Sequence, residues 1–286
     1  MSSAATVTLD APSGLARLRK YLRIYRVSLT ERLIYRGDFF LSTILRFLPM
    51  VTTILLWQAI FAGANEQKIA GFTHRQMIAY LLLVHISRMF SSMPGLAPTI
   101  ARDIREGTLK KYLLQPLDMQ CYLLAYRAAH KTAYIATTSI PYGILFLCCY
   151  DFFRELASPS VQLVAAYIAS LLLAFVIGFF FELCVGMIGF WFLEISSLVY
   201  VINTANFFVS GQMFPLDLLP DWFSDPLKAL PFKYLAYFPA ALLVGKVEGE
   251  EIWHGLLAAS AWAIAFVVLA RILYRMGLRR YSAFGG

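Results

Sequence analysis

The sequence predicts an all-α integral membrane protein with six transmembrane helices. An N-terminal interfacial amphipathic helix should precede them, and short re-entrant or interfacial helices should precede the last span. The 286 residues are 59% hydrophobic and 15% charged, with a mean hydropathy of +0.65, whereas soluble domains carry about 25% charged residues. The apolar residues form long runs, and Lys and Arg gather in particular connections. Together these features exclude an ordinary soluble globular domain.

The N-terminal region should lie outside the membrane core. Residues 1–12 are small and polar, so we expect them to be disordered, and the basic stretch that follows is unlike a secretory signal. In residues 13–37, apolar side chains recur at steps of three and four, which predicts a helix: Leu15, Leu18, Leu22, Tyr25, Leu29 and Leu33. Arginines line another face, so this helix should lie among the cytoplasmic headgroups.

A membrane domain over residues 38–276 should follow, because six segments approach the roughly 20 apolar residues that cross a bilayer. They are Phe39–Gly63, Met77–Leu96, Thr132–Tyr150, Val161–Leu183, Ile195–Phe214 and Gly255–Tyr274. Residues 161–214 are almost continuously apolar, so we expect a tight turn between the fourth and fifth spans, near residues 186–192. Residues 277–286 form a tail.

The positions of Lys and Arg predict the orientation, because they are enriched in cytoplasmic loops. Residues 1–38, residues 97–130 and the residues after Tyr274 hold 15 of them, whereas the opposite connections hold six. Both termini should therefore be cytoplasmic. This asymmetry also accounts for the net charge of +8 without nucleic-acid binding.

Residues 99–112 should form a short charged helix on the cytoplasmic side. Its apolar positions Ile100, Ile104 and Leu109 would bury a stripe. Its polar positions would face the cytoplasm: Asp103, Arg105 and Glu106. Gly107 should break the helix and Thr108 should cap the next one. Composition leaves open whether this segment docks on a soluble partner or is a solvated loop.

Polar residues within the spans are pathway or gate candidates, because such residues are costly in a bilayer and are commonly functional. The candidates are Arg46, His85, Arg88, Glu182, Asn203 and Asn206. One hypothesis pairs Arg46 or Arg88 with Glu182 or Glu194 near an inner gate; the alternative is that the arginines snorkel to the headgroups. Asn203 and Asn206 share a helix face, where they would line a pathway or join neighbouring helices.

Residues 214–246 should form an external lid. Prolines forbid one straight helix, and the aromatic residues suit short helices at the outer membrane surface. The residues that define this lid are Phe214, Pro215, Pro220, Pro231, Tyr234 and Pro239.

Sequence patterns of catalysis are missing. The chain has no G-x-x-x-x-G-K-[ST] phosphate loop, no H-E-x-x-H zinc pair and no G-x-S-x-G elbow. We therefore assign no catalytic residue, metal site or cofactor to this chain. The four cysteines are interpreted as apolar packing residues.

Two segments carry a resemblance to a known family. Ile104–Asp118 reads I-R-E-G-T-L-K-K-Y-L-L-Q-P-L-D, and it resembles the cytoplasmic signature of ABC type-2 transporter permeases: an acidic residue, Gly-Thr-Leu, a leucine run and Pro. Ser210–Trp222 is similar to the external stretch after the family's fifth helix. The resemblance extends over almost the whole chain.

The resemblance implies the permease subunit of an ATP-driven exporter in the bacterial inner membrane. Two permeases, identical or homologous, would pair above two ATPase subunits that hold ATP and Mg²⁺. Residues 99–112 would be the coupling helix, with Glu194 as a smaller contact, and membrane lipid would surround the assembly. No motif names the substrate, which in relatives is a drug, a cationic compound, a lipid or a glycan. The alternatives are an ion channel or secondary carrier, and an intramembrane enzyme.

Overall fold

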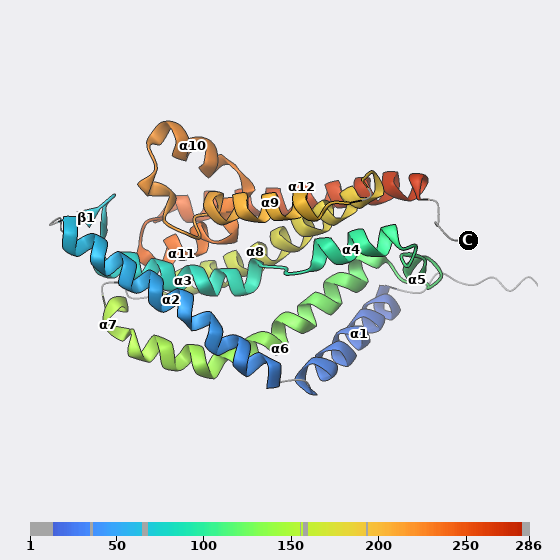
Figure 1. The fold of residues 1–286 in the computed structure, drawn as a ribbon, viewed down its shortest axis with the longest axis horizontal. Coiled ribbons are helices and arrows are strands. Elements are labelled where there is room, and N and C mark those ends of the chain that lie inside the picture. The colour runs from blue at the N-terminus through green and yellow to red at the C-terminus, as the bar shows by residue number, and fades with distance from the viewer. Residues whose placement is uncertain are drawn as a thin grey trace, which may run out of the picture.

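The computed structural model describes residues 14–34, 37–64, 68–154, 156, 160–192 and 194–281. Within the first two helices it leaves some side chains undescribed, among them those of residues 37–46. The expectations for residues 1–12 and 282–286 lie outside the described part. Long helices run along the molecule in Figure 1. Toward one end lie β1 (Lys68–Ile69), α7 (Tyr150–Phe153) and α10 (Asp221–Ala229), and toward the other lie α5 (Lys110–Leu113) and the C-terminus.

Within the described part of the chain, four helical stretches have the length and apolarity to cross a membrane. They are Phe47–Ala64 within α2 (Gly37–Ala64), His74–Arg105, Val161–Phe190 and Glu250–Arg280. The helix α6 (Met119–Cys148) is not in this group, and α9 (Ser196–Val209) has 14 residues, about 21 Å at the usual helical rise. The fold is therefore that of a mostly helical membrane protein, and the count of six spans stays a prediction.

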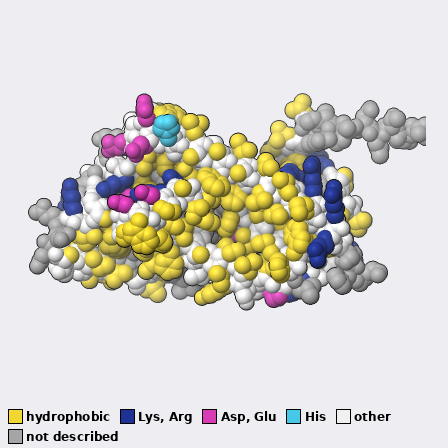
Figure 2. Space-filling model, turned by 90° about the horizontal axis from the view of Figure 1, so that it is seen from above, with side chains coloured by type: hydrophobic (Ala, Val, Ile, Leu, Met, Phe, Trp, Pro, Cys, Tyr) yellow, Lys and Arg dark blue, Asp and Glu magenta, His cyan; other side chains and the backbone are white. Residues whose placement is uncertain are grey.

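The surface has the polarity expected of a membrane protein. Figure 2 shows apolar side chains across the middle of one face, with a group of Lys and Arg at one end and Asp, Glu and His mixed with Lys and Arg at the other. The basic end is the end where the C-terminal helix finishes in Arg279 and Arg280. An apolar band between two polar ends matches the lipid-facing surface of a spanning bundle.

The N-terminal helix α1 (Gly14–Ile34) lies along α6. The Tyr25 hydroxyl donates to Thr132 Oγ1 over 2.9 Å, and Arg32 donates to the Tyr126 hydroxyl. Leu15, Leu18 and Leu22, from the expected apolar stripe, are each at least half exposed. An apolar stripe turned away from the protein is what a helix resting on lipid requires.

The helix α3 (His74–Ser91) begins at a small hairpin and ends at a break. Strands β1 (Lys68–Ile69) and β2 (Phe72–Thr73) pair antiparallel, so the chain is not purely α-helical. Thr73 and Gln76 form a capping box at the start of α3. The expected span from Met77 to Leu96 lies within the stretch His74–Arg105, but its helix is interrupted, because the chain leaves the helix at Ser92 and passes through Pro94 and the left-handed Gly95 (φ 73°).

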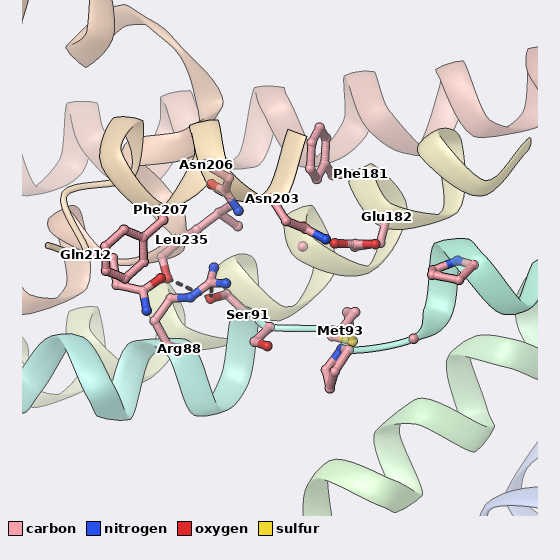
Figure 3. Close-up of a pocket in the computed structure, with 15 residues that line it drawn as sticks. Arg88, Ser91, Met93, Phe181, Glu182, Asn203, Asn206, Phe207, Gln212 and Leu235 are labelled. Atoms are coloured by element: carbon pink, nitrogen blue, oxygen red, sulfur yellow. Dashed lines mark hydrogen bonds between the residues drawn. The ribbon is translucent and has the colours of Figure 1, made fainter. Parts of the chain in front are cut away.

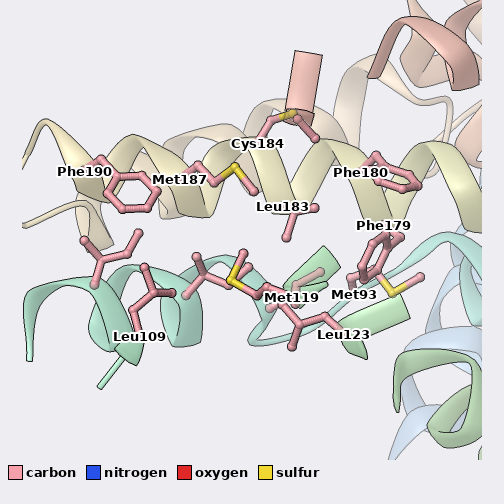
Figure 4. Packing of buried hydrophobic residues seen from close by; sticks show 14 residues of the cluster. Met93, Leu109, Met119, Leu123, Phe179, Phe180, Leu183, Cys184, Met187 and Phe190 are labelled. Atoms are coloured by element: carbon pink, nitrogen blue, oxygen red, sulfur yellow. The ribbon is translucent and has the colours of Figure 1, made fainter. Parts of the chain in front are cut away.

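Two short helices follow the break, α4 (Leu96–Arg105) and α5 (Lys110–Leu113). The predicted stripe is confirmed, since Ile100, Ile104 and Leu109 are all buried. Figure 4 shows their cluster, in which Leu109 and Met119 lie below Leu183 and Met187 of α8 (Val161–Met187). The α4 helix is therefore fixed to the membrane helices by an apolar core.

Glycines allow α8 to approach α3 and α4 closely. A Cβ placed on Gly178 would lie 2.0 Å from the carbonyl oxygen of Ser91. One on Gly186 would lie 2.9 Å from the carbonyl oxygen of Ala97. Small residues permit this kind of backbone approach between membrane helices.

The predicted tight turn after α8 is confirmed. A 3₁₀ turn, η1 (Ile188–Phe190), leads to α9, which starts at Ser196. The fifth span was expected to reach Phe214, and this end is wrong. The helix α9 stops at Val209, because Ser210 and the left-handed Gly211 (φ 75°) turn the chain back.

Short helices make up residues 216–244, as predicted. They are η2 (Leu216–Leu218), α10 (Asp221–Ala229), η3 (Pro231–Leu235) and α11 (Tyr237–Val244). Prolines stand at their starts, where the missing N–H costs no helical hydrogen bond: Pro215, Pro220 and Pro231 each precede or open one helix. Pro239 falls in the first turn of α11.

The last helix, α12 (Glu250–Arg280), packs along α8. It begins before the expected Gly255 and continues past Tyr274 into the expected tail. One further short helix, α7 (Tyr150–Phe153), directly follows α6.

Candidate functional site

A polar cavity of about 290 Å³ lies at the break between α3 and α4. Its walls come from the end of α3, the break itself, the middle of α8 and the last turns of α9. Four of the predicted pathway residues line it: Arg88, Glu182, Asn203 and Asn206. They come from three helices that are far apart in the sequence, α3, α8 and α9, and the fold brings them to one cavity.

The two charged residues face the cavity from different helices. In Figure 3, Arg88 and Gln212 lie toward one side, and Glu182 and Asn203 lie toward the other. Arg88 Nη1 donates to Ser91 Oγ over 3.3 Å, and Ser91 Oγ donates to the carbonyl oxygen of Leu235 over 2.7 Å. Glu182 lies near the first turn of α4, beside the N–H of Ala97.

The structure brings Arg88 and Glu182 into one cavity without joining them. Among the described residues, no ion pair within 4.0 Å links these two side chains. The expected cluster of an Arg with a Glu is thus present as two separated charges. Glu194 takes no part in it, because it pairs elsewhere.

Two of the predicted pathway residues are not placed in this cavity. The side chain of Arg46 lies outside the described residues. His85 lies one turn before Arg88 on α3 and is not among the lining residues. Gln212, a further polar residue of the expected fifth span, also lines it, and so do Ser91 and Ser92, which the prediction passed over. The Ser-Ser-Met-Pro-Gly sequence at residues 91–95 was the signal for a broken helix with polar groups.

The segment around α4 and α5 is held by a buried carboxylate. Asp103 was expected to face the cytoplasm, and this is wrong, since it is 7% exposed. Thr108 Oγ1 donates to Asp103 Oδ1 over 2.9 Å, and Lys111 Nζ donates to Oδ2 over 2.7 Å. Burial alone would lower the pKa of Lys111, but its bond to Asp103 raises it above its ordinary value. Asp103 thus braces the turn between the two helices.

The turn itself departs partly from its prediction. Gly107 ends α4 with a left-handed backbone (φ 70°), as expected. Thr108 does not cap α5, because its hydroxyl is engaged with Asp103, and α5 has no side-chain cap. Two charged residues remain on the outer surface of this turn, Arg105 and Glu106, and both are exposed.

An ion pair joins α4 to the connection before α9. Arg105 Nη1 lies 2.7 Å from Glu194 Oε2, and the Ser196 N–H donates to Glu194 Oε1 over 2.8 Å. The bonds from Ser196 and then from Arg105 hold the pKa of Glu194 below its ordinary value. The two segments predicted to meet an ATPase therefore form one continuous surface.

The residues of the predicted lid are mostly packed rather than free. Pro215, Pro231, Tyr234 and Pro239 are buried, Phe214 is half-buried, and Pro220 is exposed. Asp217 holds the segment together by accepting hydrogen bonds from Lys228 Nζ over 2.8 Å and from the Tyr237 hydroxyl over 2.7 Å. Burial, and then Asp217, raises the pKa of Tyr237 above its ordinary value. Whether this unit acts as a lid stays a prediction.

Within the described ranges, no three His, Cys, Asp or Glu side chains gather as metal ligands. No curated protein matches the chain. A family model does match: the one described as "ABC-2 family transporter protein" covers residues 47–285.

Proposed function

The chain belongs to the ABC-2 family of transporter proteins, and from this premise we propose that it is the permease subunit of an ATP-driven exporter. The family match over residues 47–285 is the observation that carries the proposal. Its location would be the bacterial inner membrane with both termini in the cytoplasm. The basic end of the molecule, where Lys and Arg gather in Figure 2, supports this orientation.

The energy for transport would come from a separate ATPase that docks on the α4–α5 segment. This segment is short, charged on its outer surface and fixed to α8 by buried apolar residues. Because α4 meets Gly186 of α8 at close range, a displacement of α4 would move α8 with it. The Arg105–Glu194 pair extends the same docking surface to the start of α9.

The substrate route would pass the polar cavity at the α3–α4 break. The route is bounded by α3, α8 and α9, and the packed segment 214–246 would close its outer end. A second permease, identical or homologous, would complete the route in the assembled complex. Coupling then follows from geometry, because α4 begins at the cavity and ends at the docking surface.

Purification from the native membrane tests the partner. We expect a soluble ATPase with a phosphate-binding loop to co-purify with the chain. Repeated isolation without such an ATPase would favour an ion channel or a carrier driven by a gradient.

A charge reversal tests the docking surface. Glu106→Arg should leave the chain inserted and folded but abolish the stimulation of ATPase activity by substrate. Glu248→Arg, a charge reversal at an exposed residue before α12, is the matched control and should retain stimulation. Normal transport by Glu106→Arg would remove the coupling role from this turn.

A further inference from the structure

The cavity at the α3–α4 break contains two charges of opposite sign that attract each other across it but form no direct ion pair. Arg88 and Glu182 both line it, and Figure 3 shows them on different sides, with the Asn203 side chain beside Glu182. Charged groups within a membrane domain are costly unless they are paired. A charged ligand that spans the cavity would remove this cost at both ends.

Two residues that line the cavity also carry a buried polar atom without a hydrogen-bond partner. Arg88 Nε is buried and has no hydrogen-bond partner, and Asn206 Oδ1 is likewise buried without one. Buried polar atoms are nearly always satisfied in folded proteins, so a partner for each is to be expected from outside the chain. Arg88 Nε requires an acceptor, for which a carboxylate or phosphate is the best match. Asn206 Oδ1 requires a donor, such as an ammonium group.

Ligands of other charge types fit this arrangement less well. A simple cation would leave Arg88 unpaired and be repelled by it, and a simple anion would meet the same difficulty at Glu182. A neutral ligand would satisfy the amides of Asn203, Asn206 and Gln212 but leave both charges unpaired. A cavity of about 290 Å³ admits a small solute or one lipid headgroup.

We propose that this cavity binds a zwitterionic group, with its anionic end at Arg88 and its ammonium end at Glu182 and Asn206. The inference rests on the proposed function only for its second step, that the bound group is the transported one. The binding itself needs neither an ATPase nor a second permease. A free solute and a zwitterionic lipid headgroup share the required chemistry.

A series of amino acids with increasing charge separation tests the binding. Glycine, β-alanine, γ-aminobutyrate, δ-aminovalerate and ε-aminocaproate are titrated into the purified full chain in detergent, by calorimetry. We expect affinity to peak at one length. Hexanoate and pentylamine, which each carry one of the two charges of δ-aminovalerate, should bind at least about tenfold more weakly than the best zwitterion.

Variants assign the binding to the two charges. Arg88→Gln and Glu182→Gln should each lower the affinity for the best zwitterion at least about tenfold. Arg275→Gln and Glu250→Gln, at exposed positions on α12, should change its affinity less than about twofold. Thermal unfolding of each variant separates a lost site from a lost fold. If Arg88→Gln destroys the fold, Glu182→Gln and the single-charge analogues carry the test.

A lipid arm distinguishes the two sources of the zwitterion. The titration is repeated in nanodiscs of phosphatidylethanolamine and of phosphatidylglycerol. If the solute binds more weakly in phosphatidylethanolamine than in phosphatidylglycerol, the zwitterionic headgroup competes for the cavity and is its occupant. If the solute binds equally well in both lipids, the occupant is a free solute. The proposal is overturned if no member of the series binds, if a single-charge analogue binds as tightly as the best zwitterion, or if both neutral variants keep full affinity. Failure of ATPase co-purification would instead overturn the proposed function and leave the binding result unchanged.

Discussion

Single residues decide how closely the helices around the cavity approach. Gly178 on α8 faces the end of α3, and any Cβ there would lie 2.0 Å from the Ser91 carbonyl oxygen. That oxygen belongs to backbone, which cannot move aside as a flexible side chain can. The break after α3 and the lining of the cavity therefore both depend on the absence of a side chain at Gly178.

Replacing Gly178 by alanine should destabilise the protein. We expect the overpacked interface to cost about 1–3 kcal/mol of unfolding free energy, and the cavity to lose shape because α3 and α8 must separate. Thermal unfolding of the purified protein in detergent measures this loss.

The control is Gly143→Ala on α6, where a Cβ would meet nothing within 4 Å. It should be neutral or raise stability by up to about 1 kcal/mol, since alanine favours helix. Equal unfolding temperatures for the two variants would show that Gly178 is not a packing requirement.

Asp118 joins the start of α6 to α12. It caps α6 by accepting from the Cys121 N–H over 2.8 Å, and Arg271 donates to its other oxygen. Burial would raise the pKa of Asp118, but the bonds from Arg271 and Cys121 hold it below the usual 3.8. Since the folded state binds the proton less readily, this carboxylate stabilises the fold above pH 3.8 and stops doing so as the pH falls through its lower folded pKa.

Asp118→Asn should therefore lower the free energy of unfolding by an amount that depends on pH. Asparagine retains the cap but loses the charge, and the pair is partly exposed, so we expect a loss of up to about 1 kcal/mol near neutral pH. The difference in unfolding temperature between wild type and variant should shrink as the pH falls below about 4. A difference that stays constant from pH 7 to pH 3 would contradict the assigned role of the charge.

At the scale of elements, α4, the turn and α5 behave as one braced unit. The backbone oxygen of Asp103 accepts from the Leu109 N–H over 2.9 Å, and its carboxylate binds Thr108 and Lys111. Under the proposed function, this turn would have to be rigid in order to transmit movement from an ATPase to the membrane helices. Gly107 makes the backbone of the turn more flexible, and the bonds to the Asp103 carboxylate restrain it.

Asp103→Ala should loosen the unit without unfolding the protein. Removing the carboxylate leaves Thr108 and Lys111 without their partner, which we expect to cost about 1–3 kcal/mol locally. Amide hydrogen exchange in residues 104–113 should become faster, and coupling to the ATPase should fall. Arg102→Ala, at an exposed position on the same helix, should leave both unchanged. Unaltered exchange in Asp103→Ala would mean that the apolar stripe alone holds the turn.

Elements with strong local signals could be predicted from the sequence, and those with competing signals could not. Long apolar runs predicted the start of α8 and placed its end four residues too early. They placed the start of α12 five residues too late and its end six residues too early. The second span was taken too far because Met93 and Leu96 continue its apolar pattern, while Pro94 and Gly95 end the helix. Asp103 was misjudged because a carboxylate among charged residues is expected in water, and only the folded turn shows its partners.

At the scale of the whole molecule, the candidate site depends on contacts that no local pattern contains. Arg88, Glu182 and Asn206 each stood out as polar residues in apolar helices, so their individual selection was possible. Their convergence required the order in which α3, α8 and α9 pack, which a single sequence does not determine. The absence of a direct ion pair between Arg88 and Glu182 is a further property of that packing, and the zwitterion proposal is built on it.

The two ends of the molecule should lie on opposite sides of the membrane, and the coupling proposal depends on which end is cytoplasmic. The basic end carries α5 and the C-terminus, and the opposite end carries β1, α7 and α10. If the basic end is cytoplasmic, Lys110 on α5 must face the ATPase and Asp225 on α10 must face outward. In a background without the four native cysteines, Asp225→Cys should react with a membrane-impermeant maleimide on intact cells. Lys110→Cys should react only after the membrane is opened. Both sites are exposed, so accessibility within the fold cannot produce the difference. Labelling of Lys110→Cys on intact cells would place α4 and α5 outside, where no ATPase could reach them, and would overturn the coupling mechanism.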